Sequence, residues 1–165
     1  MKKKVIVGIV IVLVIFAGII IGGSLYMLNY SLRPDFPKDN ATAYNGLFST
    51  YPHLKQWVDS LNSISALKDT VIINPEGKHL KAYYVAAPQP TSRTAVIIHG
   101  YTDSAIRMMM IGYMFNHDLD FNILLPDLQY HGQSEGSAIQ MGWKDRLDVL
   151  QWMDVANEIY GNNTQ

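Results

Sequence analysis

The residues whose types and spacing most suggest chemistry lie between His131 and Gly136. The run Gly132-Gln133-Ser134-Glu135-Gly136 fits the pattern G-x-S-x-G, in which a serine hydroxyl between two glycines can act as a nucleophile. Such a serine needs a sharp, strained turn that joins a buried strand directly to the following helix. The elements around Ser134 therefore decide what the motif means.

Those elements alternate between strand-like and helix-like patterns. Two β-rich runs, 70–73 and 79–86, flank the turn residues 74–77 and predict a hairpin. The continuous apolar runs TAVIIHG and FNILLPD predict strands that are buried on both faces. Helices are expected over 51–64, 104–117 and 143–161. Strands that alternate with helices predict a parallel sheet, here with an antiparallel hairpin at its edge.

Apolar spacing also predicts which helix residues face the sheet. In 143–161 these are Leu147, Leu150, Val155 and Ile159, with Trp143 and Trp152 as further sheet-facing residues. In 104–117 they are Ile106, Met109, Met110, Tyr113 and Met114, with Asp103 or Ser104 as the N-cap.

Ser134 does not lie where a strained strand-to-helix turn would place it. The strand expected before it ends at Pro126, eight positions earlier, and Glu135-Gly136-Ser137 continues the loop instead of starting a helix. We therefore expect the Ser134 hydroxyl to form hydrogen bonds within its own loop.

Two of these motifs resemble one family. TAVIIHGYTDS is similar to the strand and HG-x loop of the α/β-hydrolases, and NILLPDLQYHGQSEG is similar to their next strand with its D-x-x-x-H-G-x-S-x-G loop. The resemblance covers about Asp69 to Tyr160 and is nearest to the serine aminopeptidase and monoacylglycerol-lipase-like branches, which include membrane-anchored bacterial members. It implies the amino-terminal half of an α/β-hydrolase sheet.

The resemblance also implies roles for individual residues. The backbone N–H of Tyr101, just after His99-Gly100, would donate to the oxyanion that forms during acyl transfer. The structural residues at the rim of the site would be His99, Gly100, Asp127, His131, Gly132 and Ser134. In this family the catalytic order is serine, acid, histidine, whereas all five histidines precede Ser134. The nucleophile, acid and base are therefore expected outside this chain.

The amino terminus predicts a membrane anchor. Lys2, Lys3 and Lys4 precede a run without charged side chains that continues to Arg33, and residues 5–27 suffice to cross a bilayer. The lysines place the amino terminus in the cytoplasm and the remainder outside. A cleaved signal peptide is the alternative, with a weak small-residue cleavage site at Gly22-Gly23-Ser24. The expected organisation is an anchor over 1–28, a linker over 29–45 and a partial hydrolase domain over 46–165.

Composition limits the partners and cofactors. Of thirteen basic side chains three lie in the lysine run, against fourteen acidic ones, so the exported part is acidic and nucleic acid is not an expected partner. The absence of cysteine excludes disulfides and thiol chemistry. Asp127, His131 and His99 lack the spacing of a metal site, and no cofactor is expected.

The expected function is that of the first part of a membrane-anchored serine hydrolase that acts on ester or amide bonds of a small molecule or peptide, inactive by itself. The last helix should return to another parallel strand, which the sequence does not contain. Two alternatives remain open. The chain is a non-catalytic membrane-tethered module, or it is an assembly component that completes its sheet with another chain.

Overall fold

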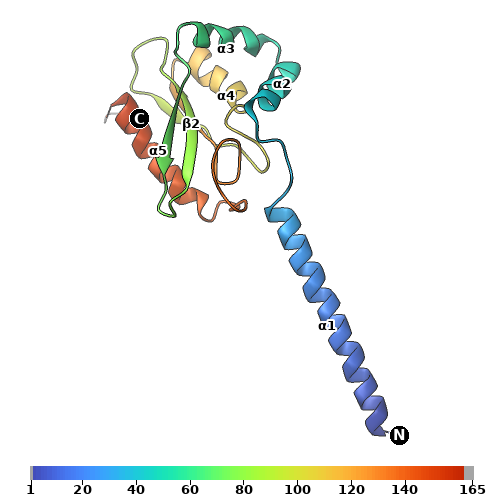
Figure 1. Cartoon of the computed structure of the whole chain (residues 1–165). Coiled ribbons are helices and arrows are strands. Elements are labelled where there is room, and N and C mark those ends of the chain that lie inside the picture. The colour runs from blue at the N-terminus through green and yellow to red at the C-terminus, as the bar shows by residue number, and fades with distance from the viewer. Residues whose placement is uncertain (1, 162–165) are drawn as a thin grey trace. The chain divides into compact units, whose positions relative to one another are not determined.

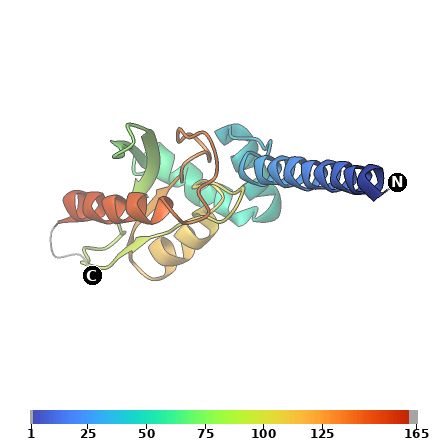
Figure 2. The ribbon, with the colours of Figure 1, turned by 90° about the horizontal axis from the view of Figure 1, so that it is seen from below.

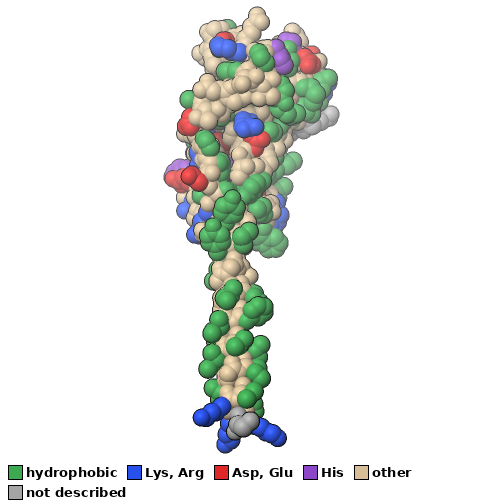
Figure 3. Space-filling model, turned by 90° about the vertical axis from the view of Figure 1, so that its right-hand side faces the viewer, with side chains coloured by type: hydrophobic (Ala, Val, Ile, Leu, Met, Phe, Trp, Pro, Cys, Tyr) green, Lys and Arg blue, Asp and Glu red, His purple; other side chains and the backbone are tan. Residues whose placement is uncertain are grey.

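The computed structural model describes residues 2–161, which fall into two compact units that meet between Asp35 and Phe36. The first unit is the helix α1 (Lys2–Leu32), labelled in Figure 1. Its 31 residues correspond to about 46 Å of helix, against about 30 Å of bilayer hydrocarbon. Apolar side chains surround it, with Lys side chains at its amino-terminal end (Figure 3). By length and composition α1 is able to cross a membrane.

The second unit contains a four-stranded sheet in the order β1-β2-β4-β3. The strands are β1 (Lys68–Ile73), β2 (His79–Val85), β3 (Thr94–Val96) and β4 (Asn122–Pro126). β2 pairs antiparallel with both β1 and β4, whereas β3 pairs parallel with β4. The predicted hairpin and the predicted parallel pair are both confirmed. Of the two strands expected to be buried on both faces, β4 is buried but β3 is only partly buried, because within residues 2–161 no strand covers its other edge.

Helices cover both faces of this sheet (Figures 1 and 2). One face packs against α2 (Asn40–Thr50), α3 (His53–Ser63) and α4 (Met109–Tyr113), which is continued by the π-helix η1 (Met114–Asp118). The other face packs against α5 (Asp145–Tyr160). The alternation along β4 explains the two layers, because Ile123 and Leu125 enter the first core and Leu124 enters the second.

The face that α5 presents to the sheet differs from the one expected. Trp152 and Ala156 are buried together with Asp145 and Asp148, whereas the predicted sheet-facing residues Leu147, Leu150 and Trp143 are exposed. Val155 and Ile159 do pack against the core, partly buried. The Asp148 carboxylate explains the rotation, because it accepts hydrogen bonds from the side chains of Asn74 (3.0 Å) and Gln129 (2.8 Å). A buried carboxylate with two donors is tolerated in a core, and apolar periodicity cannot reveal it.

The helix expected over 104–117 is shorter and irregular. Residues 105–108 form turns, α4 starts at Met109, and neither Asp103 nor Ser104 is its N-cap. In η1 the buried Asn116 side chain donates to the carbonyl oxygens of Ala86 (3.0 Å) and Phe121 (2.9 Å). These bonds attach the wider π-turn to the chain on either side of the helix, which fits the use of π-turns at special positions.

The segment between α1 and α2 is shorter than the linker expected over 29–45. α1 continues to Leu32, and α2 begins at Asn40. The Asp39 carboxylate caps α2 by accepting the Thr42 N–H at 2.8 Å, and the Asn40 side chain donates to the Tyr83 hydroxyl at 2.7 Å. An N-cap and one tertiary bond therefore order residues that lack apolar periodicity.

Candidate functional site

Two loops lie side by side at the carboxyl ends of β3 and β4, where ligands bind in open parallel sheets. The first, which we call the β3 loop, comprises residues 97–104, and the second, the β4 loop, comprises residues 127–137. Both contain the residues that the sequence singled out. Parallel pairing of β3 with β4 brings the loops together although about 30 positions separate them.

Asp127 connects the β4 loop to the turn that precedes α4. Its side chain is fully buried, and its two oxygens accept the N–H groups of Ala105 (2.7 Å) and Gln133 (2.9 Å). Burial raises the pKa of the Asp127 carboxyl, while these two bonds favour its ionised form. Asp127 thereby accepts an N–H at the start of the turn that precedes α4, in the segment where we expected Asp103 or Ser104 to cap a helix.

Gly132 allows the β4 loop to close over that carboxylate. Its φ is +47°, in the left-handed region, and a Cβ at this position would overlap the Asp127 carboxylate. A side chain at position 132 is therefore incompatible with the observed loop.

Ser134 lies inside the β4 loop with its hydroxyl fully engaged. Oγ donates to the Asp127 carbonyl oxygen at 2.6 Å and accepts the Lys81 N–H at 2.8 Å, so the loop is attached to β2. The residue is buried, and neither partner of its hydroxyl is a histidine. This geometry supports a structural role for Ser134 and provides no base for a nucleophile.

His99 is bonded to backbone groups through both ring nitrogens. Nδ1 lies 2.8 Å from the Gly100 carbonyl oxygen, and Nε2 accepts the Leu128 N–H at 3.0 Å. A carbonyl oxygen only accepts and a backbone N–H only donates, so Nδ1 carries the proton and the ring is neutral. Burial lowers the pKa of His99.

His131 in the β4 loop is likewise bonded to backbone groups through both ring nitrogens, and one of them reaches the β3 loop. Nδ1 lies 2.9 Å from the Gln129 carbonyl oxygen, and Nε2 accepts the Thr102 N–H at 3.2 Å. Burial and the neighbouring His99 ring lower the pKa of His131. Neither imidazole keeps a ring nitrogen for proton transfer.

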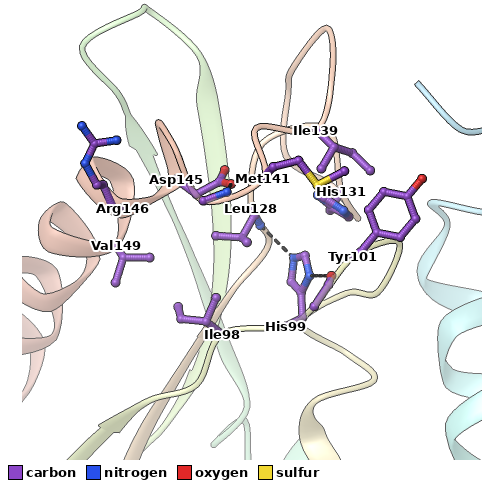
Figure 4. A pocket seen from close by; sticks show the side chains of 12 residues that line it. Ile98, His99, Tyr101, Leu128, His131, Ile139, Met141, Asp145, Arg146 and Val149 are labelled. Carbon is purple, nitrogen blue, oxygen red and sulfur yellow. Dashed lines mark hydrogen bonds between the residues drawn. The ribbon is translucent and has the colours of Figure 1, made fainter. Parts of the chain in front are cut away.

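A cavity of about 490 Å³ opens beside these loops. Figure 4 shows Tyr101 and Ile139 on one side of it, Arg146 and Val149 of α5 on the other, and His99 between them. The Tyr101 side chain is half exposed. A cavity of this size with mostly apolar walls is typical of a small-molecule site or of a gap that another segment fills.

Several residues of this region were not found by sequence reasoning. Ile139, Met141 and Arg146 line the cavity, while Gln129 and Asp148 form a buried hydrogen bond. They carry no recognisable motif, because their contacts join segments that are distant in the chain. Within residues 2–161 no cluster of three or more potential metal ligands occurs.

Comparison with known proteins relates this arrangement to other chains. No protein-family model matches the sequence. The uncharacterized protein YqkD of Bacillus subtilis (strain 168) is 31% identical over 93 residues, which are 55% of this chain and 30% of YqkD. Two crystal structures of the Pyrococcus furiosus esterase Pf2001 superimpose with a TM-score of 0.52 at 22% identity, each over 63% of this chain.

The aligned region covers 40% and 41% of those two esterase chains, so this chain spans well under half the length of the proteins it matches. The second unit therefore has the α/β-hydrolase fold, with a partial sheet of four strands.

Proposed function

We propose that this chain forms the oxyanion-loop part of a membrane-anchored serine hydrolase that cleaves ester or amide bonds. The observation that carries the proposal is the position of the β3 loop, which brings Tyr101 to the mouth of the cavity at the carboxyl end of β3. In this role the Tyr101 N–H donates to the carbonyl oxygen of the substrate as it becomes negatively charged. His99, Gly100, Asp127, His131, Gly132 and Ser134 hold the two loops in place.

The groups that break the bond come from outside the described residues in this proposal. A serine attacks the carbonyl, a histidine transfers the protons, and an acid orients that histidine. β3 pairs with β4 along one edge, and within residues 2–161 no strand pairs with its other edge. A further strand there would bring its carboxyl end next to the β3 loop and the cavity, where a nucleophile would face the Tyr101 N–H.

The substrate class follows from the chemistry of that site. A carbonyl that becomes an oxyanion belongs to an ester or an amide, and the name of the Pyrococcus esterase supports the ester. The sequence resemblance keeps the aminopeptidase and monoacylglycerol-lipase-like branches as the finer alternatives. No metal or organic cofactor takes part in the proposed reaction.

The proposed location is the outer face of a membrane. α1 inserts into the bilayer, Lys2 to Lys4 remain in the cytoplasm, and the hydrolase unit lies outside. A cysteine-accessibility experiment on full-length protein in sealed cells would test this orientation. Cysteines introduced at Lys3 and at the exposed Lys55 should be protected and labelled, respectively, and the reverse pattern would contradict the proposal.

One observation favours a second candidate function. The Ser134 hydroxyl is bonded to the Asp127 carbonyl oxygen and the Lys81 N–H, and both histidines at the cavity are bonded to the backbone through both ring nitrogens. A non-catalytic membrane-tethered module, or a subunit that completes its sheet with another chain, has the same property.

Labelling of native membranes with a fluorophosphonate probe, which reacts with activated serines, separates the two candidates. The protein is then recovered by an antibody to residues 36–60 and its intact mass is measured. A probe-labelled protein much heavier than the 18.6 kDa of this chain would support the hydrolase. A protein of 18.6 kDa that is neither labelled nor associated with a labelled partner would contradict it and favour the non-catalytic module.

A further inference from the structure

Two buried imidazoles connect the β3 and β4 loops reciprocally. His99 belongs to the β3 loop and accepts the N–H of Leu128 in the β4 loop, while His131 belongs to the β4 loop and accepts the N–H of Thr102 in the β3 loop. Their ring centroids lie 4.6 Å apart, and both side chains are almost fully buried. We call these two rings and their two cross-loop bonds the histidine brace.

We propose that His99 and His131 are positioning residues that hold the oxyanion loop in its working conformation only while both imidazoles are neutral. The effect on catalysis rests on the proposed function, whereas the brace itself is a property of the described loops. A fall in pH would then release the β3 loop and switch the site off.

The chemistry of the bonds explains why neutrality is required. A protonated imidazole carries hydrogen on both ring nitrogens, so Nε2 could no longer accept. The Leu128 and Thr102 amides would each face another N–H donor in a buried place. Two imidazolium rings 4.6 Å apart would also repel each other.

Thr102 shows why the β3 loop depends on this brace. Its φ is +56°, a left-handed conformation that is unfavourable for a β-branched residue and persists only where the surroundings impose it. The His131 bond is made to the N–H of this residue. Without that bond the strained residue can relax and rotate the peptide that joins Tyr101 to Thr102, next to the proposed oxyanion donor.

Some groups around the two rings lower the pKa values of His99 and His131, and others raise them. Desolvation lowers the pKa of both imidazoles, and their mutual interaction lowers that of His131 further, which keeps the brace neutral near pH 7. Three carboxylates oppose this effect, namely Asp103 on the β3 loop, Asp127 after β4 and Asp145 on α5. From the segment before α2, the Phe36 ring lies 5.5 Å from the His131 ring, and Lys38 lies 5.4 Å from the centre of the Phe36 ring.

A matched pair of variants separates the two bonds of His131. His131→Gln retains an acceptor near the Nε2 position but cannot be protonated in the accessible pH range, whereas His131→Asn retains a donor near Nδ1 and loses the acceptor for Thr102. His117→Gln, at an exposed histidine outside the site, is the control.

The full chain in detergent micelles, labelled with ¹⁵N, provides the readout. In the wild type both imidazoles should be Nδ1-protonated tautomers with a pKa below the ordinary value of about 6.5. The Thr102 amide should exchange with solvent about fivefold faster in His131→Asn at pH 7, as expected for one lost hydrogen bond, and at the wild-type rate in His131→Gln and His117→Gln. On acidification its protection should fall in the wild type and persist in His131→Gln.

Two results would overturn the brace: an Nε2-protonated tautomer at either ring, or equal Thr102 exchange in His131→Asn and the wild type. Neither measurement depends on hydrolysis. If exchange behaves as expected but the complete protein shows no hydrolase activity, the brace stands and the proposed function fails. If hydrolysis is found, His131→Asn should lower kcat with little change in KM. His131→Gln should shift the acid limb of the pH dependence of kcat. If kcat and its pH dependence are unchanged in both variants, the positioning role is overturned.

Discussion

Replacement of Asp127 by Asn is the sharpest test of how the two loops are held. The two side chains have the same shape, but Asn keeps one accepting oxygen where Asp127 uses two, for the N–H groups of Ala105 at 2.7 Å and Gln133 at 2.9 Å. Whichever way the amide is oriented, its NH₂ group faces one of these backbone donors in a fully buried place.

The magnitude follows from these contacts. A buried N–H without an acceptor costs about 1–3 kcal/mol, and the remaining bond loses its charge-assisted part of about 1 kcal/mol. Part of this loss is offset, because burial disfavours the ionised carboxylate and a neutral amide avoids that cost. We therefore expect Asp127→Asn to lower the free energy of unfolding by about 2 kcal/mol, and Asp127→Ala, which removes both acceptors, by about 3 kcal/mol or more.

Urea unfolding of the full chain in micelles, followed by tryptophan fluorescence, measures this change. All three tryptophans lie in the second unit, so the signal does not report on α1. Asp59→Asn is the control, because Asp59 forms an exposed pair with Lys55 and should change stability by less than about 0.5 kcal/mol. If Asp127→Asn unfolds at the same urea concentration as Asp59→Asn with an unchanged slope, Asp127 does not hold the loops and the reasoning is wrong.

The remaining predictions concern the site and the sheet. Gly132→Ala should destabilise the second unit by about 2 kcal/mol or more in the same urea assay, because it combines a left-handed φ with overlap against the buried carboxylate; a change below 0.5 kcal/mol would show that the loop adapts freely. In the complete protein Tyr101→Pro, which lacks the N–H, should lower kcat about 10²-fold or more, whereas Tyr101→Phe should retain kcat; equal activity of the two variants would contradict the role of the Tyr101 N–H. Ser134→Ala should retain labelling by a fluorophosphonate probe, and lost labelling with an intact fold would contradict its structural role. Trp152→Ala should cost about 3–5 kcal/mol and Leu150→Ala less than 0.5 kcal/mol, and comparable losses would mean that α5 is rotated from its observed position. The pKa values of His99 and His131 are lowered in the folded chain, so their contribution to stability should be complete above pH 6.5 and decline below it, where the unfolded chain binds protons first. The raised pKa of Asp127 acts in the opposite direction, and comparison with a variant in which both histidines are Gln removes its contribution. After that correction, a denaturation midpoint that stays constant from pH 7 to pH 5 would contradict the prediction.

Much of the fold could be predicted from local patterns. The apolar run before Arg33, the turn residues 74–77 and the apolar runs that end at Gly100 and Asp127 each report on neighbouring residues only. Such signals suffice for α1, the hairpin and the parallel pair, because side-chain periodicity and turn chemistry act over a few positions. The place of Ser134 in a long loop could be read in the same way, from its distance to Pro126.

Only the tertiary structure decided which polar groups are buried and what they bind. Sequence periodicity predicted that Leu147 and Leu150 face the sheet. The folded chain buries Asp148 instead, because the side chains of Asn74 and Gln129, 74 and 19 positions away, donate hydrogen bonds to it. Asp127 likewise caps a turn 22 positions earlier in the chain, and His99 and His131 exchange bonds between two loops. The physical reason is common to all of them. A buried polar group must find its hydrogen-bond partner wherever the fold places one, and no local pattern in the sequence records that partner.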